Sequence, residues 1–126
     1  MTLVLDTGAF VAVERGNRRL AAEIKREWLA GRPAVTHGGV IGQVWRGGSG
    51  RQFNLARTIE FVNVAALGAE LGKQAGALLA LAGGNDVVDA AVVRLARDDD
   101  LVLTSDPDDL LVLAAASGVR MEIIVV

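Results

Sequence analysis

Residues 83–109 read GGNDVVDAAVVRLARDDDLVLTSDPDD, and the order of residue types in this stretch indicates the fold class. A glycine pair precedes a nearly all-apolar segment of helical length, and the short apolar run LVLT follows before an acidic turn. A helix that leads directly into a buried strand is the unit from which parallel sheets are built. The stretch therefore predicts an α/β fold with carboxylates placed where its apolar elements end.

The rest of the chain follows the same alternation of strand and helix. Further strands are predicted at residues 2–5, 34–36, 61–64 and 121–126. Helices are predicted at residues 7–14, 17–29, 40–45, 52–59, 67–82 and 107–116, with Asn17 as the cap of the second. The strands are apolar throughout, which is typical of a parallel sheet buried on both faces. We expect an α/β three-layer sandwich with a central, mainly parallel sheet and helices on both faces.

Three glycines in the predicted helix 67–82 need their own explanation. Gly68, Gly72 and Gly76 are spaced four apart, so they share one helix face. Glycine weakens a helix, and a row of glycines allows another helix to approach closely. The spacing therefore predicts that this face packs tightly against a neighbouring helix.

The composition of the chain restricts its function. The 126 residues suit one domain spanning positions 1–126, and the net charge of −2 limits any nucleic-acid contact to local basic patches. The absence of cysteine excludes disulfides and thiolate chemistry, and the single His37 excludes a multi-histidine zinc site. Apolar runs fall short of the roughly 20 residues that cross a bilayer, and no signal-peptide pattern is present. We expect a cytoplasmic protein with no membrane association.

Carboxylates stand at the ends of several predicted elements. Asp6 and Asp106 follow strands directly, and Asp86 and Asp89 fall in the first turn of one helix, so all four are expected near one sheet edge. Asp6 also suits a tight turn, Asp86 suits a helix N-cap, and Asp106 suits a cap for a helix starting at Pro107. Asp89 has apolar neighbours on nearly every side, where a carboxylate without a partner costs stability. The run at residues 98–100 is interpreted as a solvated turn.

The joint pattern of these acids favours a hard metal ion. Oxygen ligands around an open edge suit Mg²⁺ or Mn²⁺, and such ions serve phosphoryl chemistry. The chain has no GxxxxGK[ST] loop, no GxGxxG after a strand, and no serine in a GxSxG elbow. Metal-dependent phosphoryl chemistry is the class of activity that these patterns favour.

Four segments together resemble the PIN-domain ribonucleases, and in particular the VapC-type toxins of bacterial toxin–antitoxin pairs. The segments are LVLDTGAFVAVERG at 3–16, VIGQVWRGG at 40–48, DVVDAAVVRLA at 86–96 and LVLTSDPDDLLVLA at 101–114. They span nearly the whole chain, and their order and spacing carry the resemblance. It implies a PIN-like sandwich and endonucleolytic cleavage of RNA by water activated by Mg²⁺ or Mn²⁺.

The resemblance also implies a set of site residues. Asp6, Asp89 and Asp106 match metal-binding acids of the family, and Asp86 would assist them. The family has a glutamate in the helix after the second strand, where this chain has Gln43. The amide removes one negative charge from the site, although it can still orient a water or act as a weak ligand. Natural weakening, transfer of the role to an acid such as Asp86, and an inactivating change made for study all fit this departure.

The substrate and partners follow from the same resemblance. Arg46 and Arg51 flank a glycine-rich turn, Arg57 follows on the next helix, and Arg15 belongs to a second basic cluster; arginine suits phosphate contact. We expect RNA as substrate, a homodimer, and a small cognate antitoxin that binds in or across the cleft. His37 is expected to be structural, although it can approach the cleft from the end of the second strand.

Two other functions remain open at the level of sequence. Gln43 also suits a catalytically impaired PIN-like module that binds RNA or a partner without cutting. A receiver-like signalling domain shares strand-end aspartates, but it needs a lysine after a late strand. Lys25 and Lys73 are the only lysines, and both fall in predicted helices.

Overall fold

Short apolar runs form the strands at the centre of the molecule. A computed structural model describes residues 1–48 and 50–126 of the chain. Ser49, in the glycine-rich turn next to Arg51, lies outside the described residues. The strands are β1 (Leu3–Leu5), β2 (Ala34–His37), β3 (Val62–Ala65), β4 (Leu101–Thr104) and β5 (Glu122–Val125). The helices are α1 (Thr7–Glu14), α2 (Arg18–Leu29), α3 (Gly38–Val44), the 3₁₀ turn η1 (Gly50–Gln52), α4 (Phe53–Ile59), α5 (Ala69–Ala82), α6 (Val87–Leu95) and α7 (Asp108–Ser117).

The strands form one parallel sheet in the order β3-β2-β1-β4-β5. The chain builds the sheet outward from β1 through β2 to β3, and then returns to place β4 on the other side of β1. The order in which strands are added therefore reverses between β1 and β4. Ligands bind at such a switch point in open α/β sheets. Leu5 pairs with Leu103, and the backbone N–H of Asp6 donates to the Leu103 carbonyl at 3.3 Å. The residues that follow β1 and β4 thus begin side by side.

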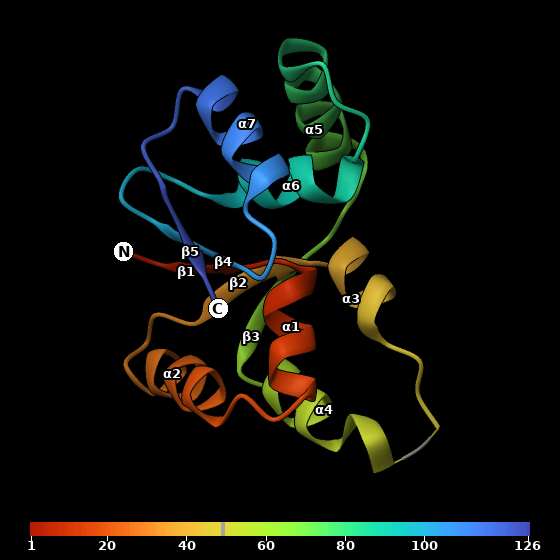
Figure 1. Cartoon of the computed structure of the whole chain (residues 1–126), viewed down its shortest axis with the longest axis vertical. Coiled ribbons are helices and arrows are strands. Elements are labelled where there is room, and N and C mark those ends of the chain that lie inside the picture. The colour runs from red at the N-terminus through yellow and green to blue at the C-terminus, as the bar shows by residue number, and fades with distance from the viewer. Residues whose placement is uncertain (49) are drawn as a thin grey trace.

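Helices cover both faces of the sheet, as Figure 1 shows: α1, α2 and α4 lie on one side, and α5, α6 and α7 lie on the other. All three β1 side chains are buried, with Leu3 at 1% exposure and both Val4 and Leu5 at 0%. Apolar side chains on both faces of a strand are what two helical layers require. The expectation of an α/β three-layer sandwich is confirmed, and the sheet in the described residues is parallel throughout.

Two local expectations have opposite outcomes. Asn17 caps α2 as predicted, since its Oδ1 accepts the Leu20 N–H at 3.0 Å. The prediction for Gly68, Gly72 and Gly76 is wrong, because a Cβ added at any of them would meet nothing within 4 Å among the described residues. Helix α5 instead buries Ala75 and Leu78, so its tight packing lies on another face.

The acidic run at residues 98–100 is only partly solvated. Asp98 and Asp99 are exposed, but Asp100 has 7% exposure and accepts the backbone N–H groups of Thr2 at 2.8 Å and Arg97 at 2.9 Å. The prediction of a solvated turn is therefore wrong for Asp100. A buried carboxylate is needed there because these N–H groups at the start of β1 and after α6 would otherwise lack acceptors.

In the described ranges, no single helix is long and apolar enough to span a membrane. Helices α5 and α6 meet the length and composition criteria only as a pair, and the pair is bent by 106°.

Candidate functional site

Asp6 is the most enclosed of the candidate carboxylates. It follows β1 and caps α1, where its Oδ1 accepts the Ala9 N–H at 3.0 Å, and its exposure is 6%. Burial raises the pKa of Asp6 and outweighs the hydrogen bonds from Thr104, Ala9 and Gly8 that lower it; the charge of Asp106 raises it further. The negative charge of Asp6 is thus held in place by the fold at some cost in free energy.

The loop after β4 comes close to the start of α1 because position 8 is glycine. A Cβ on Gly8 would lie 2.2 Å from Ser105 Oγ and 2.7 Å from the Ser105 backbone nitrogen. Any other residue would therefore push the loop away and separate Asp106 from Asp6. The sequence pattern around Asp6 suits a tight turn and does not reveal this contact.

Asp106 occupies the bend between β4 and α7 and does not cap the helix. Helix α7 begins at Asp108, and its N-cap is Pro107, which makes no side-chain capping bond. The cap interpretation of Asp106 is therefore wrong, because the N-cap position falls on Pro107 and the helix begins one residue later than predicted. The Asp106 backbone N–H donates to Thr104 Oγ1 at 3.0 Å, and the side chain is exposed. Its carboxylate is left available for an external partner.

Asp89 joins this group from α6, on the opposite face of the sheet. Asp86 caps the helix, as predicted, and its Oδ1 accepts the Asp89 N–H at 3.1 Å. Burial is the main cause that raises the pKa of Asp89 to about 6, followed by the charges of Asp86, Asp6 and Asp109 and a hydrogen bond with Asp86. Carboxylates from β1, α6 and α7 therefore lie close enough to repel one another.

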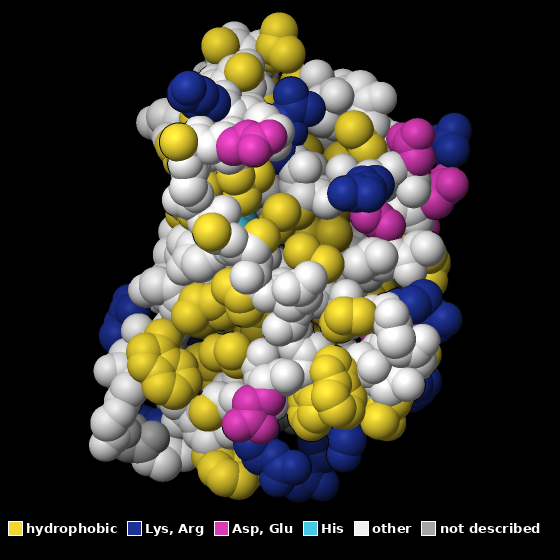
Figure 2. Space-filling view, turned by 180° about the vertical axis from the view of Figure 1, so that it is seen from behind, with side chains coloured by type: hydrophobic (Ala, Val, Ile, Leu, Met, Phe, Trp, Pro, Cys, Tyr) yellow, Lys and Arg dark blue, Asp and Glu magenta, His cyan; other side chains and the backbone are white. Residues whose placement is uncertain are grey.

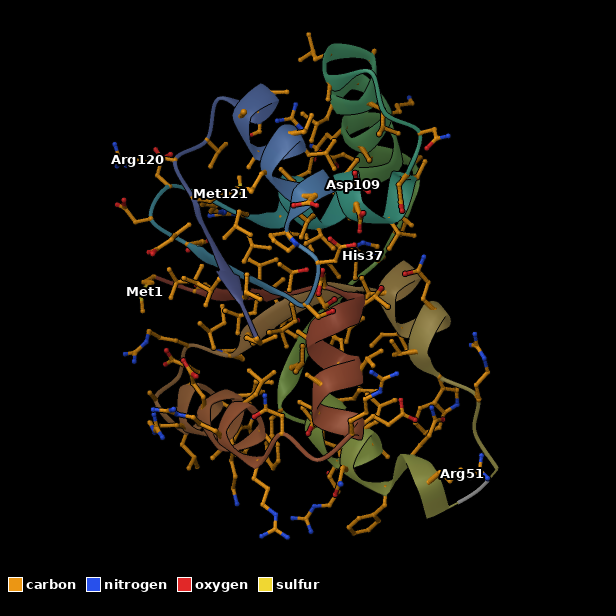
Figure 3. The ribbon with its side chains drawn as sticks, viewed as in Figure 1. Met1, His37, Arg51, Asp109, Arg120 and Met121 are labelled. Atoms are coloured by element: carbon orange, nitrogen blue, oxygen red, sulfur yellow. The ribbon has the colours of Figure 1, made fainter. Side chains whose placement is uncertain are left out.

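Asp109 is the member of this group that sequence reasoning missed as a site residue. It was expected in the first turn of the last helix, and the structure confirms that position. Its position three residues after Asp106 was a signal, but the direction of its side chain depends on how α7 packs over α6. Figure 3 shows Asp109 at the same end of the sheet as His37, the right-hand end in that view.

Gln43 lies at the border of the acidic group. It belongs to α3, and its Oε1 accepts a hydrogen bond from the hydroxyl of Thr7, the residue next to Asp6. The structure therefore places Gln43 in contact with the residue that follows Asp6. Its amide oxygen, the atom that would face a metal ion or a water, is engaged by Thr7.

His37 is buried next to the site, where it contacts the backbone of α3 and α6. Its exposure is 0%, its Nδ1 accepts the Gly39 N–H at 3.0 Å, and its Nε2 lies 2.9 Å from the Val88 carbonyl oxygen. Burial lowers the pKa of His37, and the hydrogen bond to Val88 opposes that effect. The structural interpretation of His37 is confirmed.

The arginines named for RNA contact do not gather around the carboxylates. Arg15 follows α1 at its far end, and Arg46 donates from Nη1 to the carbonyl oxygens of Gly42 at 3.2 Å and Trp45 at 2.8 Å. Arg51 lies in η1, and Figure 3 shows it well away from Asp109. Gln52, next to Arg51, accepts the Arg46 backbone N–H at 2.9 Å and donates to Glu14, next to Arg15, at 3.2 Å, so these arginines start from one region of the chain surface.

Cationic side chains gather instead in a hollow between α2 and α4, here called the basic groove. Its volume is about 490 Å³, and its lining includes Arg18, Lys25 and Arg57 with Phe53 and Phe61, while none of the described residues that line it is acidic. Figure 2 shows Lys and Arg side chains crowding the lower end of the molecule, where α2 and α4 lie. The groove and the carboxylates are at opposite ends of α1.

The donor chemistry of the acidic group fits a hard divalent cation. Asp6, Asp89 and Asp106 offer oxygen atoms alone, and a bound positive charge would offset both the burial and the repulsion that raise the pKa values of Asp6 and Asp89. Within residues 1–48 and 50–126, no three Asp, Glu or His side chains stand in an arrangement ready to hold a metal ion. Binding would therefore require the exposed Asp106 or its neighbours to adjust their rotamers.

The sequence was also compared with models of known protein families and with curated proteins, and neither comparison finds a match.

Proposed function

We propose that the protein is a metal-dependent endoribonuclease of the PIN type, which acts as the toxin of a toxin–antitoxin pair in the cytoplasm. The observation that carries the proposal is that Asp6 and Asp106 follow the paired strands β1 and β4, and that burial, followed by neighbouring charges that include Asp6, raises the pKa of Asp89. A fold has no structural need to gather like charges from distant parts of the chain, and such gatherings are common at catalytic sites.

In this proposal, Asp6, Asp89 and Asp106 hold Mg²⁺ or Mn²⁺. When bound, the ion would supply positive charge to the scissile phosphate and acidify a water molecule. The cap bond to Ala9 fixes the Asp6 carboxylate before any ligand arrives, and Asp86 fixes the first turn that carries Asp89. Donors fixed in advance need little reorganisation on binding.

Catalysis can be tested by cleavage of bacterial total RNA with Mn²⁺ under single-turnover conditions. We expect the wild type to cut RNA and Asp89→Asn to cut it at least about 100-fold more slowly. That is the upper end of the loss seen when a residue that supports a metal ligand is removed. Asp108→Asn is the matched control, since Asp108 lies in the first turn of α7 and is not among the charges that raise the pKa of Asp89. Equal cleavage by the wild type and Asp89→Asn would refute the site assignment.

The partners belong to the same proposal. Arg15, Arg46 and Arg51 are the proposed phosphate contacts, and exposed apolar side chains such as Trp28 and Trp45 offer surface for a second copy or an antitoxin. Induced expression is expected to arrest growth, and co-expression of a short neighbouring reading frame is expected to relieve the arrest. Growth that continues despite accumulation of folded protein would contradict the toxin role.

One observation favours a second candidate, a PIN-like module that binds RNA or a partner without cutting. The Gln43 amide oxygen is already bonded to Thr7, so it is less available to a metal ion or a water molecule. The Gln43→Glu variant separates the two candidates. If the wild type is active, Gln43→Glu is expected to cleave RNA about tenfold faster than the wild type. One more carboxylate adds at least about 1.4 kcal/mol of attraction to a cation. Cleavage by Gln43→Glu alone would establish that the chain with Gln43 is the binding module.

A further inference from the structure

The imidazole of His37 makes two hydrogen bonds that require opposite properties of its two nitrogens. The Val88 carbonyl only accepts, so Nε2 at 2.9 Å must carry a proton. The Gly39 N–H only donates, so Nδ1 at 3.0 Å must carry none. The ring is therefore neutral and in a single tautomer, and it is completely buried.

The two bonds lead to different parts of the candidate site. Val88 lies in the first turn of α6, directly before Asp89, and Gly39 lies in the first turn of α3, which carries Gln43. The ring packs directly against Gly39, since a Cβ at this position would lie 2.8 Å from His37 Cε1 and 3.0 Å from Nδ1. One side chain at the end of β2 thus connects the helix of Asp89 with the helix of Gln43.

A cap alone would not require histidine. Asparagine and serine are better known N-caps, but their side chains are shorter than an imidazole and end at the acceptor atom. The second ring nitrogen of His37 extends past the cap to reach α6, on the opposite face of the sheet from α1. The bridge to Val88 is therefore a separate property of this residue.

We propose that His37 is a positioning residue: its neutral ring holds the first turn of α6 against the start of α3 and so fixes Asp89 relative to Asp6 and Gln43. Its effect on cleavage rests on the proposed ribonuclease function. Its effect on α6 does not, because the hydrogen bonds exist whatever the reaction.

Two substitutions separate the cap from the bridge. His37→Asn places an amide oxygen near the position of Nδ1 and keeps the cap, but it has no group that reaches Val88. His37→Gln places an amide N–H₂ near the position of Nε2 and keeps a donor for the Val88 carbonyl. If positioning matters, His37→Asn lowers kcat by about 10- to 100-fold at unchanged KM, and His37→Gln recovers part of that loss. A purely structural role would lower both variants according to their thermal stability, without rescue by glutamine.

Hydrogen exchange tests the bridge without reference to activity. The amides of Asp89 and Ala90 donate to the Asp86 side chain and backbone, and they report on the first turn of α6. We expect these amides to exchange at least tenfold faster in His37→Asn than in the wild type, while amides of β1 keep their protection. Unchanged exchange would overturn the proposal even in a protein that cuts RNA. Faster exchange in a protein that never cuts RNA would support the bridge and refute the ribonuclease function.

Nitrogen-15 spectra of the wild-type ring supply a measurement that needs no variant. We expect the neutral tautomer with the proton on Nε2 at pH 7, and a protected Nε2–H signal. A ring protonated on Nδ1, or a charged ring, is incompatible with the two bonds and would overturn the proposal.

Discussion

Helix α1 joins two regions of opposite charge. At its start, Asp6 is buried near Asp89, Asp106 and other carboxylates; burial raises the pKa values of Asp6 and Asp89, and the neighbouring negative charges raise them further. Past its end, the basic groove holds its cations differently. Lys25 Nζ lies 5.7 Å from the centre of the Phe61 ring, and the Arg57 guanidinium lies 5.7 Å from the centre of the Phe53 ring.

The two regions differ in what their charges cost the folded state. An aromatic face attracts a cation by roughly 0.5–1 kcal/mol at exposed sites, so the groove is compatible with an ordinary, stable surface. A buried carboxylate such as Asp6, with the half-buried Asp89 nearby, destabilises the fold unless a positive charge joins them. A bound cation would therefore stabilise the folded state at the acidic end of α1, whereas the basic groove needs no ligand to be stable.

The largest expected effect is at Asp6. Asp6→Asn keeps a side-chain oxygen for the cap of α1, because asparagine is as good an N-cap as aspartate. We therefore expect RNA cleavage to fall about 100-fold or more, with the free energy of unfolding equal to or above that of the wild type. Cleavage assays and urea denaturation on the same preparation measure both. A variant that loses activity only in proportion to lost stability would remove the distinction between the two regions.

Metal binding gives the next largest effect. Mn²⁺ at 100 times its dissociation constant should stabilise the wild type by about 2.7 kcal/mol, because the ion binds the folded acids and not the dispersed ones. Thermal unfolding with and without a chelator measures this gain, and Asp89→Asn should lose most of it. Asp108→Asn should retain it. Stabilisation of equal size in Asp89→Asn would place the ion elsewhere.

The fold is largely predictable from sequence because its elements are encoded locally. Continuous apolar runs such as LVL and LVLT form buried strands, and Asn17 and Asp86 cap helices through bonds to residues three positions away. Patterns of this kind need no knowledge of the rest of the chain. Element types therefore agree with the structure, while boundaries differ by a residue or two.

The site is less predictable because it depends on which elements meet. The proximity of Asp89 to Asp109 follows from the packing of α6 on α7, and that of Asp6 to Asp106 requires β4 beside β1 and glycine at position 8. None of these contacts has a periodic signal. The second hydrogen bond of His37 is equally long-range, since its partner lies 51 residues further along the chain.

The dependence of stability on pH sharpens the difference in cost. The pKa of Asp89 is about 6 in the folded protein, against an ordinary value of 3.8, so the folded state binds its proton more tightly than the unfolded state. Stability without metal should therefore fall as the pH rises from about 4 to about 6, and the full loss should persist above that range. Because Asp89 is only half-buried, solvent screening reduces the expected loss to about 1 kcal/mol. Urea denaturation at pH 4.5 and 7 should show this contribution in the wild type and not in Asp89→Asn.

The smallest effect is expected in the basic groove. Arg57→Gln should change the free energy of unfolding by no more than about 0.5 kcal/mol, as is usual for surface substitutions. Arg97 is an exposed arginine before β4, at the opposite end of the strands from the acids, and serves as the reference position. The RNA affinity of Arg57→Gln should depend on salt as steeply as the RNA affinity of Arg97→Gln. This follows because Arg57 lies over Phe53 in the groove, at the other end of α1 from the carboxylates. Each phosphate contact contributes about one unit to the salt slope. A slope that falls by about one in Arg57→Gln, but not in Arg97→Gln, would make the groove part of the RNA surface, and the charges at both ends of α1 would then serve one substrate.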